Sequence, residues 1–122
     1  MQTVAVLGAS TDRTKFGNKA VRAFLRKGCT VFPINPKEST IEGLFVYKNI
    51  SELPVRPGIV TAYLPPPVVL KVLPEIARKG CDELWLNPGT GSPEVVAAAE
   101  QLGLKVIQAC SIVGAGMSPA DL

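Results

Sequence analysis

Small, polar and basic residues follow the first apolar run of the chain in an order that suits an anionic ligand. Gly8-Ala9-Ser10-Thr11 comes directly after Val4–Leu7, and Arg13 and Lys15 lead on to helical spacing from Phe16. A tight turn at a glycine, followed by a helix N-terminus, offers unpaired N–H groups and a partial positive charge to a phosphate. Two glycines of the G-x-G-x-x-G fingerprint are missing, so a simple strand-to-helix turn is the alternative.

A second segment, Asn35-Pro36-Lys37, follows the apolar run Thr30–Ile34. Enzymes that bind NAD usually place an acidic residue at this point to hold the ribose 2′-hydroxyl. A neutral amide, a rigid turn and a cation suit a phosphorylated ribose better than a bare diol. A proline-containing turn with a solvated lysine is the alternative.

Three further strand ends carry candidate ligand contacts. Leu64-Pro65, followed by two more prolines, would form a stiff apolar wall for a flat aromatic ring, although a helix start also explains the prolines. Asn87 opens a glycine turn that could present amides and hydroxyls to the same crevice. Cys110 follows the last apolar run, where it either faces a ligand thiol or is a small buried hydrophobic residue.

The candidate residues named so far include no recognisable catalytic or metal-binding combination. The chain has no histidine, which excludes Ser-His-Asp and Cys-His nucleophiles and histidine-bound metals. Its three cysteines are widely spaced, which argues against both a disulfide framework and a zinc site. Glu38 and Glu42 are the only acids near a strand end, and such charges are usually just solvated. The sequence therefore favours a binding protein over an enzyme, with no catalytic residue assigned.

Five short apolar runs must position these residues. The runs expected to be strands are Val4–Leu7, Thr30–Ile34, Ile59–Leu64, Glu83–Leu86 and Leu104–Ile107. Helices are expected from Phe16 to Lys27, from Val68 to Lys79 with Pro74 kinking or restarting it, and after the cap Ser92 as far as Gly103. Residues 38–57 read as irregular. Strands separated by helical or crossover segments predict an α/β fold, a doubly wound sheet of about five parallel strands with helices on both faces.

Length and composition indicate one domain spanning residues 1–122. With 47% hydrophobic and 19% charged residues the chain is ordinary for a globular protein of 122 residues. Residues 1–37 hold seven Lys or Arg against one acid, a charge of +6, whereas the rest of the chain carries −3. An anion is therefore expected in the first third. No leader or membrane span is read from the sequence, which suggests a cytoplasmic protein without nucleic-acid or membrane partners.

The combination of Val4–Ser10, Val31–Lys37 and Leu84–Gly89 with a cysteine after the last strand resembles the small stand-alone CoA-binding domain proteins. It is also similar to the N-terminal domain of the succinyl-CoA synthetase alpha subunit. The resemblance covers nearly the whole chain and implies a Rossmann-like fold that binds coenzyme A. It does not imply the synthetase reaction, because the phosphorylated histidine of that enzyme has no counterpart here.

The resemblance also implies roles for individual residues. Gly8-Ala9-Ser10 with Arg13 or Lys15 would hold phosphate, Asn35-Pro36-Lys37 would meet the 3′-phosphorylated ribose, and Leu64-Pro65 would border the adenine.

Three hypotheses remain open at this point. The first is a small non-catalytic module that binds coenzyme A or an acyl-CoA, the second is an NAD(P)-binding module, and the third is a small enzyme acting on an acyl-CoA thioester, using Cys110. The apolar tail from Ile112 to Met117 suggests a covered surface, which leaves a homo-oligomer open as well.

Overall fold

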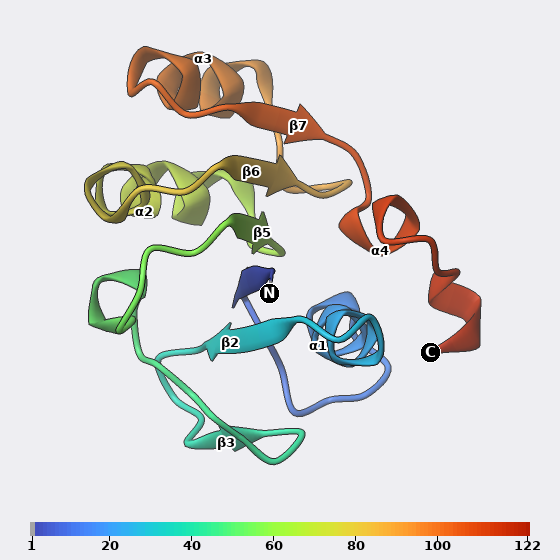
Figure 1. Cartoon of the computed structure of the whole chain (residues 1–122). Helices are drawn as coiled ribbons and strands as arrows, with labels where there is room; N and C mark the ends of the chain where they lie inside the picture. Colours follow the sequence, from blue (N-terminus) through green and yellow to red (C-terminus); the bar gives the residue numbers. More distant parts are fainter. Residues whose placement is uncertain (1) are drawn as a thin grey trace.

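A five-stranded parallel sheet forms the centre of the molecule (Figure 1) in a computed structural model that describes residues 2–122. Its order is β2-β1-β5-β6-β7, and every neighbouring pair is parallel. The strands are β1 (Thr3–Leu7), β2 (Thr30–Ile34), β5 (Ile59–Ala62), β6 (Glu83–Leu86) and β7 (Val106–Gln108). The continuous apolar runs of β1 and β5 are buried because helices cover both faces of the sheet.

The helices form two layers, one on each face of the sheet (Figure 1). On one face α1 (Phe16–Arg26) and α4 (Ser111–Gly114) pack around a core that includes Val4, Val6 and Ile112. On the other face α2 (Pro66–Lys79) and α3 (Pro93–Gln101) enclose a core that includes Leu73 and Leu84. This arrangement confirms the α/β fold expected from the sequence, a Rossmann-like parallel sheet with helices on both faces.

The chain reverses direction across the sheet between β1 and β5. From β1 it winds outward to the edge strand β2, then returns to the opposite side of β1 and continues through β5 to β7. In open α/β sheets a crevice opens at this switch point, beyond the carboxyl ends of the strands. Pro33, which cannot donate to the sheet, is tolerated because β2 is an edge strand.

Residues 38–57 are more ordered than the sequence suggested. They form a hairpin of β3 (Thr40–Ile41) and β4 (Leu44–Phe45), followed by the short 3₁₀ helix η1 (Ile50–Glu52). Both turn residues, Glu42 at φ 51° and Gly43 at φ 77°, adopt the left-handed conformation that two-residue hairpins require. The buried side chains of this segment are Ile41, Val46, Ile50, Leu53 and Pro57.

Several expected elements differ in detail, among them the third predicted strand, which ends at Ala62 rather than Leu64. The last strand begins at Val106 rather than Leu104, because the Leu104 N–H bonds the Ala99 carbonyl and so belongs to the exit from α3. Of the two alternatives at Pro74, a kink or a restart, the restart is wrong, because α2 continues through Pro74 as one helix. This helix begins earlier than expected, at Pro66, a residue that suits the first turn because its missing N–H has no partner there.

The apolar tail is partly covered by the chain itself. Ile112 is fully buried, and Ala115 and Met117 pack against the same core, whereas Val113 remains 60% exposed. The Lys19 ammonium on α1 donates to the Pro119 carbonyl at 3.0 Å, which ties the end of the chain to α1. No helix within residues 2–122 is long and apolar enough to cross a membrane.

Candidate functional site

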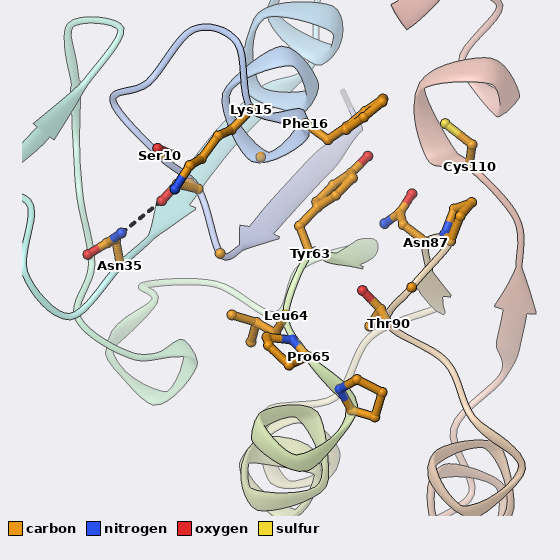
Figure 2. A pocket seen from close by; sticks show the side chains of 16 residues that line it. Ser10, Lys15, Phe16, Asn35, Tyr63, Leu64, Pro65, Asn87, Thr90 and Cys110 are labelled. Atoms are coloured by element: carbon orange, nitrogen blue, oxygen red, sulfur yellow. Dashed lines mark hydrogen bonds between the residues drawn. The ribbon is translucent and has the colours of Figure 1, made fainter.

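A pocket of about 580 Å³ opens beyond the carboxyl ends of β1, β5 and β6. Cavities of this size accept small molecules and cofactors. One side, the first wall, is formed by Gly8, Ala9, Ser10, Lys15, Phe16, Gly17 and Asn35. The opposite side, the second wall, is formed by Tyr63, Leu64, Pro65, Pro66, Asn87, Pro88, Gly89, Thr90 and Cys110. Figure 2 shows the labelled side chains of both walls around the shared space.

Two glycines let the backbone of the first wall pack closely. A Cβ on Gly17 would lie 2.2 Å from the Gly8 carbonyl oxygen, and a Cβ on Gly8 would lie 2.4 Å from the Tyr63 carbonyl oxygen. Gly8 also has a φ of +80°, which L side chains rarely adopt. Gly17 therefore sets the close helix–loop approach that the third glycine provides in a dinucleotide fingerprint.

Two asparagine amides hold the loop between β1 and α1. Asn35 Nδ2 donates to the Ala9 carbonyl at 2.9 Å, and Asn18 Nδ2 donates to the Ser10 carbonyl at 2.9 Å. Two oxygens that would repel an anion are thereby occupied. Asn35 Oδ1 also accepts the backbone N–H groups of Lys37 at 2.8 Å and Glu38 at 3.2 Å, so this residue organises the turn after β2 as well.

The N-terminus of α1 faces the pocket without a side-chain cap. Lys15 occupies the cap position and makes no capping hydrogen bond, and no acid lies in the first turn. The free N–H groups and the helix dipole therefore remain available to an anion. Figure 2 shows the Lys15 side chain extending toward Ser10 and Asn35, which adds a full positive charge to this side of the pocket.

Four of the residues singled out from the sequence are not part of the pocket lining: Thr11, Arg13, Pro36 and Lys37. All four are exposed. Arg13 Nη1 is paired with Glu42 Oε1 at 2.8 Å, and Glu42 Oε2 accepts a bond from Asn18 at 3.1 Å. Glu42, expected to be merely solvated, thus connects the β3–β4 hairpin to the loop after β1.

The second wall contains a buried network of uncharged groups. Asn87 is 2% exposed, and its Oδ1 accepts the Ser111 N–H at 2.8 Å. Its Nδ2 donates to Thr61 Oγ1 at 2.7 Å and to the Ala62 carbonyl at 2.9 Å. Thr90 Oγ1 donates to the same carbonyl at 3.1 Å. Asn87 lines the pocket as expected, but its amide is used mainly to join β5, β6 and α4.

Tyr63 brings this network to the pocket surface. Its hydroxyl lies 3.0 Å from Ser111 Oγ, which in turn lies 2.7 Å from Thr61 Oγ1. Burial raises the pKa of Tyr63 to about 12, while the Ser111 and Thr61 hydroxyls oppose the rise. The phenol therefore stays protonated, and able to donate, throughout the neutral range.

Seven residues that the sequence-based site did not include also line the pocket: Phe16, Gly17, Tyr63, Pro66, Pro88, Gly89 and Thr90. Position could have indicated two of them: Tyr63 directly follows β5, and Phe16 is the first residue of α1. Phe16 is 51% exposed and lies under the Lys19 ammonium, 5.4 Å from the ring centre. A large exposed aromatic ring at a pocket mouth is a contact surface that charge and glycine patterns do not reveal.

The three cysteines lie in different surroundings. Cys110 is half-buried and lines the pocket, immediately before α4. Cys29 and Cys81 are half-buried and pack against the two cores, outside the pocket. Burial raises the pKa of Cys81 to about 11, so its thiol is unreactive at neutral pH.

Comparisons with known proteins show the family to which the chain belongs. A family profile described as a CoA binding domain matches residues 2–115. An ADP-forming acetate–CoA ligase I of Archaeoglobus fulgidus is 28% identical over 87% of the chain, and an ADP-forming acetate–CoA ligase II alpha subunit of Pyrococcus furiosus is 27% identical over 85%. The chain spans only 17% and 25% of the lengths of these two relatives.

Solved structures with the same fold include a protein of similar size. A conserved hypothetical protein from Pyrococcus furiosus superposes with a TM-score of 0.85 at 33% identity, covering 93% of this chain and 99% of that one. A dinucleotide-forming acetyl-coenzyme A synthetase 1 from Ca. Korarchaeum cryptofilum, in complex with phosphate and ADP, superposes with a TM-score of 0.79 at 27% identity. In that comparison the match covers 88% of this chain and 25% of the synthetase.

Proposed function

The chain belongs to the CoA binding domain family, and from this premise we propose that it binds coenzyme A or an acyl-CoA in the pocket between the two walls, without catalysing a reaction. The observation that carries the proposal is the uncapped N-terminus of α1, which faces the pocket beside Lys15. The diphosphate of coenzyme A supplies the anion that this arrangement suits.

The turn after β2 supports a phosphorylated ribose on the outer side of the first wall. Asn35 stands where NAD enzymes usually have an acid, and its amide already holds the loop and the turn. Lys37, two residues further on, is exposed, and its ammonium is a suitable partner for a ribose 3′-phosphate that extends out of the pocket. Leu64 and Pro65 offer an apolar surface for the adenine across the pocket.

A non-catalytic role is supported by the neighbours of Cys110. A neighbouring base, a cation or a helix N-terminus activates a cysteine. The chain contains no histidine, and α4, which Cys110 precedes, has only four residues. The cation in the pocket lining, Lys15, lies on the opposite wall and points toward Asn35 (Figure 2). The surroundings of Cys110 therefore suit contact with a ligand rather than attack on a thioester.

Isothermal titration of the purified protein with coenzyme A, NAD and NADP tests the proposal. We expect coenzyme A to bind most tightly and to raise the melting temperature most, since a ligand at 100 times its Kd adds about 2.7 kcal/mol of stability. Equal or tighter binding of NAD would overturn the proposal in favour of a dinucleotide-binding module. In a separate incubation of the protein with acetyl-CoA, release of free thiol faster than in buffer alone would overturn the non-catalytic part.

A further inference from the structure

The hydrogen-bond network of the second wall has a fixed direction. The backbone N–H of Ser111 can only donate, so the Asn87 side-chain atom that receives it at 2.8 Å is the oxygen Oδ1. The amide nitrogen of Asn87 then faces Thr61 Oγ1 at 2.7 Å, which makes the Thr61 hydroxyl an acceptor in this contact. One backbone donor thus determines the orientation of a fully buried amide.

The remaining hydroxyl hydrogens follow from this orientation. The Thr61 hydroxyl accepts from Asn87, so its own hydrogen is available to Ser111 Oγ at 2.7 Å. Thr61 is 0% and Ser111 is 2% exposed, and a buried hydroxyl hydrogen needs an acceptor. Within the contacts at 2.7 and 3.0 Å, both hydrogens have one only when Thr61 donates to Ser111 Oγ and Ser111 donates to the Tyr63 oxygen. The chain of donors runs from Asn87 through Thr61 and Ser111 to Tyr63, which places the Tyr63 hydrogen outside the network.

We propose that Tyr63 is a specificity-determining residue whose hydroxyl donates a hydrogen bond to a neutral carbonyl oxygen of the bound ligand, in the pantetheine arm of coenzyme A. The inference rests on the proposed function. Figure 2 shows the Tyr63 oxygen pointing into the space between Phe16 and Asn87. The buried network presents this oxygen at the pocket surface as a donor.

The surroundings of the hydroxyl select a neutral acceptor rather than a phosphate. The side chains drawn beside Tyr63 in Figure 2, Phe16, Asn87 and Thr90, carry no charge. Lys15, the cation of the pocket, extends toward Ser10 and Asn35 on the first wall. An anionic group of the ligand is therefore stabilised most beside Lys15 and the α1 N-terminus. The uncharged amide groups of the pantetheine arm are then the ligand groups that Tyr63 contacts.

Removal of one hydroxyl tests the inference. Tyr63→Phe keeps the ring and removes the donor, and Tyr47→Phe is the matched control because Tyr47 packs on Phe32 and Phe45 outside the pocket. Each variant is titrated with coenzyme A and with adenosine 3′,5′-bisphosphate, which carries the phosphorylated ribose but no pantetheine. Melting curves without ligand establish that both variants are folded.

We expect Tyr63→Phe to weaken coenzyme A binding about threefold to tenfold, the effect of one neutral hydrogen bond, and to leave adenosine 3′,5′-bisphosphate binding unchanged. Tyr47→Phe should change neither affinity. Unchanged coenzyme A affinity in Tyr63→Phe, or an equal loss for both ligands, would overturn the role of Tyr63. Either result would leave the proposed function standing. A wild-type protein that binds neither ligand would instead overturn the proposed function.

Discussion

The two walls of the pocket use polar residues in opposite ways. In the first wall the Lys15 side chain is exposed, and helix α1 leaves its N-terminal N–H groups without a side-chain cap. In the second wall Asn87 is buried, and both polar atoms of its amide are hydrogen-bonded, to Thr61, Ala62 and Ser111. Unsatisfied groups therefore favour binding in one wall, while satisfied groups favour stability in the other.

This difference teaches how one pocket can receive a ligand with two chemically distinct parts. An anion is attracted by charge and free donors, which need not be rigid to be effective. A neutral chain is selected by shape and by a donor in a defined place, which requires a rigid support. Of the seven Lys and Arg in residues 1–37, Lys15 lines the pocket in the first wall, whereas the second wall contains no Lys, Arg, Asp or Glu.

The largest effect is expected where the two walls touch, at Gly8. Gly8→Ala forces an L residue to a φ of +80° and brings its Cβ to 2.4 Å from the Tyr63 carbonyl oxygen. We expect a loss of about 3 kcal/mol or more in the free energy of unfolding, measured with urea, from strain and overpacking together. Gly28→Ala is the control, because Gly28 has a φ of +89° with no atom near the added Cβ. A similar loss in both variants would show that the close contact between Gly8 and the Tyr63 carbonyl adds nothing to the destabilisation.

The two asparagines separate stability from binding. Asn87→Ala removes three hydrogen bonds from a buried site and should lower the free energy of unfolding by about 2–3 kcal/mol. Asn35→Ala exposes its former partners to water, so we expect a smaller loss of stability and a larger loss of coenzyme A affinity. Urea unfolding and calorimetric titration of both variants measure this crossover. The reverse pattern would contradict the assignment of roles to the two walls.

The charge of the first wall is tested by Lys15→Ala. Loss of a charge-assisted phosphate contact, worth about 1.5–3 kcal/mol, should weaken coenzyme A binding about 10- to 100-fold. The salt dependence of binding should also become shallower, whereas unfolding should change little. Lys71→Ala, an exposed lysine on α2, is the control. Equal affinities of the two variants would place the diphosphate away from Lys15.

The burial of the second wall predicts a loss of stability at high pH. The pKa of Tyr63 is about 12 in the folded protein against an ordinary value of 10.0, so the folded state holds the phenol proton more tightly. The contribution of the protonated phenol to the free energy of unfolding is fully present below pH 10 and is lost as the pH rises toward 12. Tyr63→Phe should therefore lose less stability than the wild type between pH 10 and pH 12 in urea unfolding. Parallel curves for the two proteins would mean that Tyr63 is not buried as described.

The smallest effect is expected at Lys37, which is exposed outside the pocket lining. An exposed ion pair contributes about 0.2–1 kcal/mol, so Lys37→Ala should weaken coenzyme A binding up to about fivefold. Dephospho-CoA, which lacks the 3′-phosphate, should bind wild type and variant equally. Equal losses for both ligands would assign Lys37 to the turn or to another phosphate.

Much of this fold could be predicted from the sequence, because buried parallel strands are continuous apolar runs with glycine and proline at their ends. The bounds of β2 and β6 agree with the predicted runs Thr30–Ile34 and Glu83–Leu86. The hairpin at Glu42 was missed because its strands have two residues each, too few to show a periodicity. Leu104 looked like strand sequence, but a hydrogen bond to the end of α3 determines its conformation.

The candidate site was predicted in part on both walls: Leu64, Pro65, Asn87 and Cys110 line the pocket on the second wall, as predicted residues do on the first. Glycine, lysine and asparagine after β1 and β2 are local signals, and Gly8, Ser10, Lys15 and Asn35 all line the pocket. The network of the second wall joins Thr61, Asn87 and Ser111, which are 24 to 50 positions apart in pairs. No spacing rule relates them, because the order of the strands alone brings them together.

A crystal structure of the protein with coenzyme A tests the division between the two walls most directly. We predict that the diphosphate lies at the N-terminus of α1 with an oxygen within hydrogen-bond distance of Lys15, and that a pantetheine carbonyl oxygen accepts a hydrogen bond from Tyr63. Coenzyme A bound with its diphosphate beside Asn87 and its pantetheine arm along the first wall, or bound outside this pocket, would contradict the account.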